Sequence, residues 1–346
     1  MDLTTKYLGL ELKHPIVASS SPLSKNLDGV KRLADAGASA IVLFSLFEEQ
    51  IRYEQESLEH LIACSDHTSA EALTFFPSYA DYHVGPGDYL ELIHRASRAV
   101  DAPVIGSLNG VSEHGWVEYA KDMVEAGAKA LELNIYFLPV DINLTSQHVE
   151  DQYIHVVQAV RGAVHVPIAV KLCPFFSSTG HMASRLVHAG ADGLVMFNRL
   201  YQPDFDIEER VVESKLELSR ASEIRLPLLW ISVLHGKLQC SLGATSGVES
   251  ADEVVKYVLA GADAVMTTSA LLRHGENHIG ALVKGLESWM DQNGFESVSQ
   301  MKGSMSHRNC AEPQAFVRAN YLKMLQSYRG TYAEAVSPNP GASISR

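Results

Sequence analysis

The sequence predicts a (β/α)8 barrel with a helical extension, and three observations support this fold class. Short apolar runs rich in β-branched residues alternate with helical segments along most of the chain. There are eight such runs, which suits a closed barrel of parallel strands better than an open sheet. The tripeptide Ala-Gly-Ala occurs four times, each time between a helical segment and an apolar run. Because such barrels take about 250 residues and tolerate insertions, the 346 residues can form one large domain.

The expected elements follow one another regularly. The strands are expected at residues 16–20, 40–44, 103–107, 130–134, 168–172, 193–197, 238–242 and 264–268. The helices between them are expected at residues 27–36, 89–100, 116–125, 149–164, 182–188, 228–236 and 251–259. Each repeat glycine follows a helix, where a left-handed cap favours glycine; these are Gly37, Gly127, Gly190 and Gly261.

Two regions fall outside the repeat. Residues 46–87 are long for a connection within a compact domain, so we expect a lid-like insertion between strands 2 and 3. The barrel should occupy residues 1–293, and residues 294–336 are expected to form a helical extension with its best helix at 313–328. The Ser-, Pro- and Gly-rich end, residues 337–346, is expected to be disordered.

Composition excludes several classes of function. An apolar content of 46% and a charged content of 20% are typical of a globular protein with a large core. The net charge of −13 argues against a nucleic-acid or anionic membrane surface as the main partner. No run approaches a membrane span of about 18 apolar residues, and no signal peptide is visible at the N-terminus, so we expect a cytoplasmic protein. Four dispersed cysteines without a CxxC pair suggest reduced thiols and no zinc site.

The residues that close the expected strands should carry the chemistry, because active sites of such barrels lie at the carboxyl ends of the strands. Apart from one lysine, this set consists of neutral hydrogen-bonding groups. It comprises Ser19, Ser20, Ser21, Ser45, Ser107, Asn109, Asn134, Lys171, Asn198, Thr245, Ser246, Gly247, Thr267, Thr268 and Ser269. Such a rim suits a polar heterocycle with a phosphate better than a metal ion, so no metal is expected.

Lys171 is the exception, since it ends an apolar strand with no carboxylate alongside it in the run. A buried ammonium is costly unless it has a partner. It could extend to solvent or pair with a distant carboxylate. Alternatively, it could face a ligand at the barrel mouth.

The loops after strands 7 and 8 favour a phosphate. In many barrels these loops bind phosphate through backbone amides and a helix N-terminus. Ser246 and Gly247 in one loop, and Thr268 and Ser269 in the other, offer amides and hydroxyls at these places. Ordinary helix capping by Ser and Thr is the alternative.

Several segments resemble the FMN-dependent dihydroorotate dehydrogenases, most closely the soluble class. They are the run from Val170 to Pro174, the run from Gly190 to Asn198, Glu132-Leu133-Asn134, and the run from Gly261 to Leu271. The likeness extends colinearly from residue 3 to about residue 300.

The resemblance implies an FMN site. The corresponding cofactor positions are Ser19, Ser20, Ser45, Ser107, Asn134, Lys171, Ser246, Gly247, Thr268 and Ser269. It places Lys171 against the flavin pyrimidine edge, where its charge would stabilise the reduced flavin. Asn134 and Asn198 correspond to asparagines that face the flavin or hold the substrate ring.

The chain departs from that family at two positions. Phe44 precedes Ser45 where the family has a second lysine. The position of the catalytic base, cysteine or serine in the family, is Phe137 or Leu138, and neither can accept a proton. Tyr136 and Cys173 are the candidate catalytic replacements, with a lid histidine such as His83 as a further one.

The resemblance implies an FMN-dependent oxidoreductase acting on CH–CH bonds, as in the oxidation of dihydroorotate to orotate in pyrimidine biosynthesis. Because the base is missing, the substrate is left open beyond a small cyclic compound. Two alternatives are a flavin-free lyase or isomerase that uses Lys171 as a Schiff-base nucleophile, and a non-catalytic FMN-binding protein. A homodimer is possible by analogy, and the electron acceptor or partner subunit is undetermined.

Overall fold

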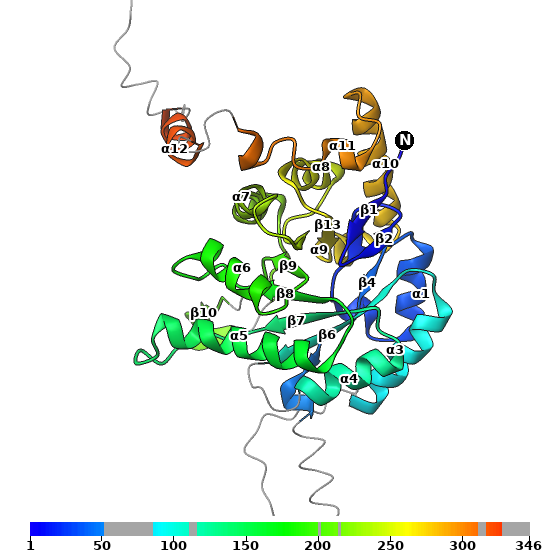
Figure 1. The fold of residues 1–346 in the computed structure, drawn as a ribbon, viewed down its shortest axis with the longest axis vertical. Coiled ribbons are helices and arrows are strands. Elements are labelled where there is room, and N and C mark those ends of the chain that lie inside the picture. Colours follow the sequence, from blue (N-terminus) through cyan, green and yellow to red (C-terminus); the bar gives the residue numbers. More distant parts are fainter. Residues whose placement is uncertain (52–85, 111–115, 200–201, 214–215, 311–315, 327–346) are drawn as a thin grey trace, which may run out of the picture.

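The computed structural model describes residues 1–51, 86–110, 116–199, 202–213, 216–310 and 316–326. Its centre is a sheet of parallel strands closed into a barrel by the pairing of β4 with β6 (Figure 1). The strands are β3 (Ile16–Ala18), β4 (Ile41–Val42), β6 (Val104–Gly110), β7 (Ala130–Ile135), β8 (Ile168–Leu172), β9 (Gly193–Met196), β12 (Ser241–Ala244) and β13 (Ala264–Thr267). The predicted (β/α)8 barrel is therefore confirmed.

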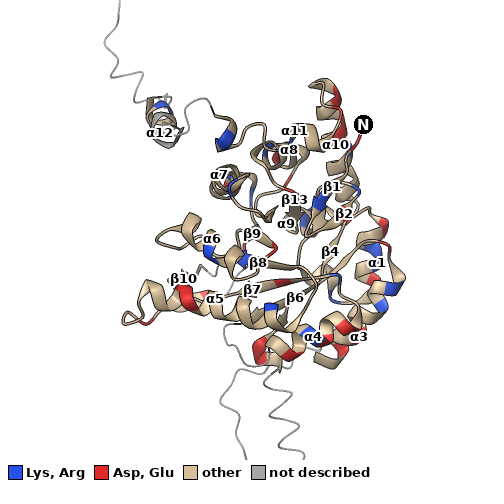
Figure 2. Ribbon diagram, viewed as in Figure 1, with Lys and Arg blue, Asp and Glu red and all other residues tan. Residues whose placement is uncertain are grey.

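Helices surround this barrel and bury one face against it. They are α1 (Leu27–Asp35), α3 (Pro86–Ala99), α4 (Trp116–Ala126), α5 (Ser146–Ala163), α6 (Thr179–His188), α7 (Arg225–Leu234), α8 (Ala251–Ala260), α9 (Ser269–His274) and α10 (His278–Gln292). Figure 2 shows that Lys, Arg, Asp and Glu lie mostly on these helices and their loops, whereas the barrel strands are largely free of charge. A charged side chain on a barrel strand is therefore unusual here.

The four repeat glycines cap their helices as predicted. Gly37, Gly127, Gly190 and Gly261 have φ of 101°, 116°, 111° and 119°, a left-handed conformation that costs other L-residues about 1–2 kcal/mol. At Gly261, the Cβ of another residue would also meet the ring of His235 at 2.3 Å. Conformation and packing thus both require glycine at that turn.

One predicted strand was misplaced. The strand expected at residues 238–242 is β12, which covers Ser241–Ala244 and pairs with both β9 and β13. Leu238 and Cys240 instead pack against the outer core in the preceding turn. The apolar side chains of that turn gave a false strand pattern, while Gly243 and Ala244 weakened the pattern of the actual strand.

The sequence did not reveal the N-terminal hairpin formed by β1 (Thr5–Tyr7) and β2 (Leu10–Leu12). Tyr7, Leu8 and Leu12 are almost fully buried and pack in one cluster with the inward-facing residues of the strands, such as Val17 and Val195. The hairpin therefore closes the amino-terminal end of the barrel.

The lid-like insertion mostly falls outside the described residues, which omit 52–85. Its ends are described: Leu46–Phe47 form β5, which pairs with β6, and α3 begins at Pro86. Pro86 and Gly87 thus belong to a helix rather than to the loop, and proline is well suited to a first helical position.

The remaining elements lie outside the barrel repeat. They are β10 (Asp204–Asp206) and β11 (Val211–Glu213), the 3-10 helices at Pro22–Ser24, Ala221–Ile224 and His307–Asn309, α11 (Val298–Met301) and α12 (Phe316–Gln326). The helix expected at 313–328 corresponds to α12, and the tail from residue 337 lies outside the described part of the chain. Within the described residues, no helix has the length and apolar character needed to cross a membrane.

His14 should make the stability of the fold depend on pH. Its Nε2 lies 2.9 Å from the carbonyl oxygen of Gly37, and its Nδ1 accepts the N–H of Ile16 at 3.2 Å, so the ring fits as neutral imidazole. Burial lowers the pKa of His14 to about 4 from 6.5. The unfolded chain therefore binds a proton below pH 6.5 that the folded chain binds only near pH 4.

We expect the contribution of His14 to the free energy of unfolding to be complete above pH 6.5. As the pH falls to 4, the free energy of unfolding should decrease by about 3 kcal/mol because of this residue. Urea unfolding at pH 7.5 and pH 4.5 measures this effect. Between these two pH values, the free energy of unfolding should decrease more in wild type than in His14→Gln. Equal losses in the two proteins would contradict this account of His14.

Candidate active site at the carboxyl ends of the strands

A cavity lies at the carboxyl ends of β3, β8, β9, β12 and β13, with about 870 Å³ of space including its open mouth. About 250 Å³ of this space is comparable with the volumes of typical ligand pockets, about 300–1,000 Å³, so the cavity is slightly smaller than that range. The predicted site residues that line it are Ser19, Ser20, Ser21, Lys171, Asn198, Thr245, Ser246, Gly247, Thr267, Thr268 and Ser269. The structure therefore brings together residues from both halves of the chain.

Three other predicted residues lie directly behind this lining. Ser45 Oγ lies 3.2 Å from Ser20 Oγ and 2.8 Å from Ser107 Oγ, which forms a chain of hydroxyls leading from the cavity into the barrel wall. Ser107 is fully buried, and its N–H donates to the hydroxyl of Tyr89. Asn134 accepts a hydrogen bond from the side-chain amide of Asn198 at 2.8 Å. These residues support the lining rather than form its surface.

Lys171 has a carboxylate partner on another strand, which is one of the alternatives that the sequence left open. Its Nζ lies 3.5 Å from Oε1 of Glu132 on the adjacent strand β7. Both residues are buried, Lys171 with 8% and Glu132 with 1% of its surface exposed. Lys171 therefore does not extend to solvent, because it is held between the cavity and a buried carboxylate.

The two loops predicted to bind a phosphate converge on Ser219. The hydroxyl of Ser219 donates to Ser269 Oγ at 2.9 Å and accepts the N–H of Gly247 at 3.2 Å. The loops after β12 and β13 thus place hydroxyls and a backbone amide together, which is the donor set that a phosphate requires.

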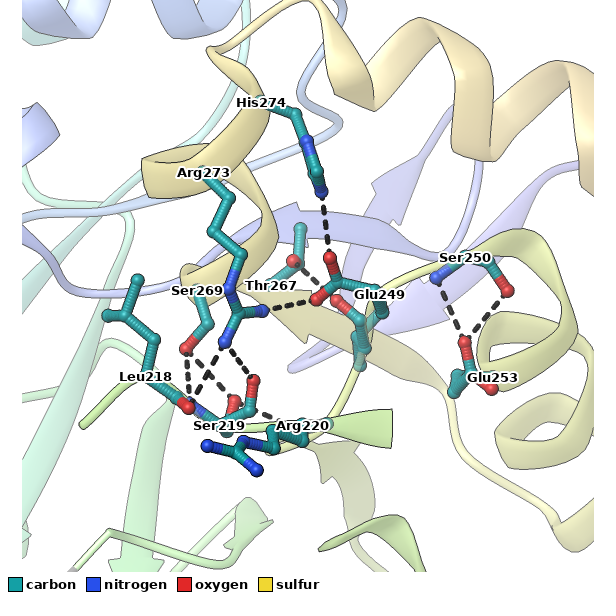
Figure 3. A network of polar contacts seen from close by, with 12 residues as sticks. Leu218, Ser219, Arg220, Glu249, Ser250, Glu253, Thr267, Ser269, Arg273 and His274 are labelled. Carbon is teal, nitrogen blue, oxygen red and sulfur yellow. Dashed lines mark hydrogen bonds and ion pairs between the residues drawn. The ribbon is translucent and has the colours of Figure 1, made fainter. Parts of the chain in front are cut away.

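Arg273 fixes this arrangement, as Figure 3 shows. Its guanidinium donates to the carbonyl oxygens of Leu218 and Ser219 at 3.1 and 2.8 Å, and it also pairs with Glu249. His274 contacts the other oxygen of Glu249 at 2.7 Å. Burial alone would raise the pKa of Glu249, but His274 and Arg273 together lower it.

The backbone at Gly247 fits a phosphate cradle. Its φ is +68°, and a Cβ there would lie 2.7 Å from the carbonyl oxygen of Arg220 and from Ile224. Only glycine therefore lets the segment around Arg220 close over this loop. Its neighbour Ser246 also has a positive φ, +81°, which a non-glycine residue adopts at a cost.

The position of the family's second lysine is occupied by an aromatic ring that lines the cavity. Phe44 lies there, and the ammonium of Lys25 lies 4.7 Å from the centre of its ring. The cation is therefore near this wall of the cavity, but it contacts the ring of Phe44.

Two of the candidate proton acceptors, Tyr136 and Cys173, are described and do not line the cavity. Tyr136 is half-buried, Phe137 packs against the outer core, and Leu138 is exposed. The thiol of Cys173 is buried and lies 3.8 Å from the hydroxyl of Tyr153 on α5. Burial raises the pKa of the Cys173 thiol, so the thiol keeps its proton near neutral pH and is not available to accept another. His83 lies outside the described residues.

Sequence reasoning missed Ser219, Arg273 and Glu132. Ser219 lies in a long connection after β9 without a recognisable motif. Glu132 carried a usable signal, because it precedes Asn134 by two residues in a strand and must face the same side. No group of His, Cys, Asp and Glu that could hold a metal ion occurs among the described residues.

Comparison with known proteins identifies the family that this sequence matches. A sequence profile described as dihydroorotate dehydrogenase matches residues 84–290. The catalytic subunit of a dihydroorotate dehydrogenase B (NAD(+)) from Methanocaldococcus jannaschii is 26% identical over 283 residues, 79% of this chain and 88% of the relative.

Two further relatives have different names. A dihydroorotate dehydrogenase A (fumarate) from Lactobacillus helveticus is 29% identical over 212 residues, 59% of this chain and 68% of the relative. The NAD-dependent dihydropyrimidine dehydrogenase subunit PreA of Escherichia coli is 22% identical over 321 residues, 87% of this chain and 76% of the relative. The names of these relatives thus specify different substrates and different oxidants.

A raised thiol pKa should make the buried Cys173 and the partly exposed Cys240 unreactive in the native protein. The pKa of Cys173 is raised, and burial followed by the charge of Asp263 raises the pKa of Cys240 to about 12. Alkylation at pH 8, followed by mass spectrometry, should label both at least about tenfold more slowly in native protein than in urea. The partly exposed Cys310 is the internal control. Rapid native labelling of Cys173 would restore it as a reactive candidate.

Proposed function

The chain belongs to the dihydroorotate dehydrogenase family, and from this premise we propose that it is an FMN-dependent oxidoreductase. In this proposal it transfers a hydride between the flavin and a carbon–carbon bond of a small cyclic substrate. The observation that carries it is the cavity with the Lys171 ammonium at its floor and converging phosphate donors at Ser219, Gly247 and Ser269. One ligand with a polar ring system and a phosphate would use both groups.

In this proposal, different described residues bind the phosphate, the ring system of the cofactor and the substrate. Ser219, Gly247 and Ser269 would hold the phosphate, and Arg273 would keep their loops in place. Lys171 would face the ring system with its positive charge, while Asn198, oriented by Asn134, would hold a cyclic substrate through its amide. The flavin itself, when bound, supplies the hydride acceptor.

The residue at the family's base position limits the choice of substrate. A positioned base typically contributes about 10²- to 10⁴-fold to the rate of a reaction that removes a proton from carbon. Phe137 and Leu138 cannot supply it, so we propose that dihydroorotate is oxidised slowly or not at all. The physiological substrate would then be a different cyclic compound, or a partner would exchange electrons with the flavin.

The proposal is tested by the flavin content of the purified protein. A yellow protein that releases FMN on denaturation supports it and excludes a flavin-free lyase. A colourless protein that takes up no added FMN overturns it. Anaerobic addition of dihydroorotate then tests the substrate: rapid bleaching of the bound flavin would show that a base at position 137 or 138 is not needed.

Replacing Lys171 by Met should weaken FMN binding by about tenfold, since one charge-assisted contact to the cofactor is lost. Lys302→Met is the matched control, because Lys302 pairs with Asp263 at 2.7 Å at the turn that begins β13, away from the cavity. Fluorescence titration of the apoprotein with FMN measures both. Unchanged affinity in Lys171→Met would remove Lys171 from the cofactor site.

Replacing Arg273 by Gln should also weaken FMN binding, by about tenfold, without any contact between Arg273 and the cofactor. The loss follows because the carbonyl groups of Leu218 and Ser219 are no longer held. Arg32→Gln is the control, since Arg32 forms a comparable pair with Glu276 on the helical ring. Equal affinities of the two variants would show that the network does not organise the phosphate loops.

A further inference from the structure

Glu132 is the most unusual charged residue in the barrel. Its side chain has 1% of its surface exposed, and neither carboxylate oxygen has a hydrogen-bond partner among the described residues. Its described ion pair is with Lys171 at 3.5 Å. Because a buried carboxylate is costly without compensation, this pair is a built feature of the barrel interior that needs a reason.

Strand register places Glu132 one layer below the cavity. Asn134 on β7 aligns with Lys171 on β8, whereas Glu132 aligns with Ala169. On its other side Glu132 aligns with Ser107 of β6. Lys171 lines the cavity and Glu132 does not, so the ammonium lies between the carboxylate and any ligand at the cavity floor.

The neighbours of Glu132 do not replace Lys171 as a counter-charge. The hydroxyl of Tyr7 is buried and also lacks a hydrogen bond among the described residues. Burial, and then the charge of Glu132, raises the pKa of Tyr7 well above its usual value. Burial likewise raises the pKa of Tyr89. Both phenols are therefore neutral at ordinary pH, and the charge of Glu132 acts mainly on Lys171.

We propose that Glu132 is a positioning residue that holds the Lys171 ammonium at the cavity floor and lowers the positive potential it presents to the flavin. This inference rests on the proposed function. Two-electron reduction with uptake of one proton leaves negative charge on the flavin pyrimidine ring, which Lys171 stabilises. Glu132 opposes that stabilisation, so the flavin is harder to reduce and, once reduced, is a stronger reductant.

The other charges at the cavity do not offset Glu132. Arg199 lines the cavity but pairs with Glu223, and Glu217 adds a further carboxylate to the lining. Lys25 contacts the ring of Phe44. The described ion pair of Glu132 is with Lys171, so a change at Glu132 acts first on this pair.

The experiment compares the two-electron reduction potential of FMN bound to wild type, Glu132→Gln and Glu132→Asp. The Gln variant keeps the shape and removes the charge, whereas the Asp variant keeps the charge. Glu150→Gln is the matched control, since Glu150 pairs with Arg185 at 3.1 Å between α5 and α6, outside the barrel. Each holoprotein is titrated anaerobically with a reductant against a reference dye.

At a fixed solution potential, Glu132→Gln should raise the ratio of reduced to oxidised flavin at least about tenfold, which equals about 30 mV for a two-electron couple. Glu132→Asp should stay nearer to wild type, and Glu150→Gln should match wild type. An unchanged or lowered ratio in Glu132→Gln would overturn the inference. An equal shift in Glu132→Asp would also overturn it, because the effect would then come from packing.

A second pair of proteins covers the case in which Glu132→Gln does not fold. The reduced fraction of the flavin is compared in Lys171→Gln and in the double variant Glu132→Gln/Lys171→Gln, both at saturating FMN. The double variant should fold because it buries only neutral amides at these positions. The reduced fraction should be higher in the double variant, and equal fractions would refute the role of Glu132. If wild type binds FMN but these shifts are absent, only this inference fails. If wild type binds no FMN, the proposed function fails and the inference fails with it.

Discussion

Closure of the sheet by the pairing of β4 with β6 is the constraint on which the site depends. In a closed parallel barrel every strand delivers its carboxyl end to the same mouth, so Ser20, Lys171 and Ser269 meet although they are far apart in the sequence. Closure also makes the interior inaccessible to water. A charge on an inward-facing strand position must therefore find its partner on a neighbouring strand, as Lys171 finds Glu132.

The regular part of this architecture could be predicted from the sequence because it rests on local signals. Periodicity located the barrel strands other than β12 and the helices α1 and α3 to α8, but not α9 and α10, and the left-handed glycines marked the turns before the strands. The misplaced strand, β12, is one in which Gly243 and Ala244 replace bulky residues. The N-terminal hairpin escaped because its role as a plug depends on contacts with strands throughout the chain, which no local pattern records.

The site residues that lie at strand ends could be predicted from the sequence. Those that lie in long connections could not. Ser246, Gly247, Thr268 and Ser269 line the cavity as expected, whereas Ser219 arrives from a long connection whose path the sequence does not specify. Lys171 was recognised as costly, but its partner lies on another strand, and only the register between β7 and β8 brings the two together. Pairings between strands are long-range properties, and for that reason they limit prediction from residues alone.

The hairpin that closes the amino-terminal end of the barrel also determines the route by which ligands reach the cavity. Tyr7, Leu8 and Leu12 fill that end with tightly packed side chains, so ligands cannot pass through the barrel from one side to the other. A reactant that uses the cavity must therefore approach it from the carboxyl-end side of the barrel.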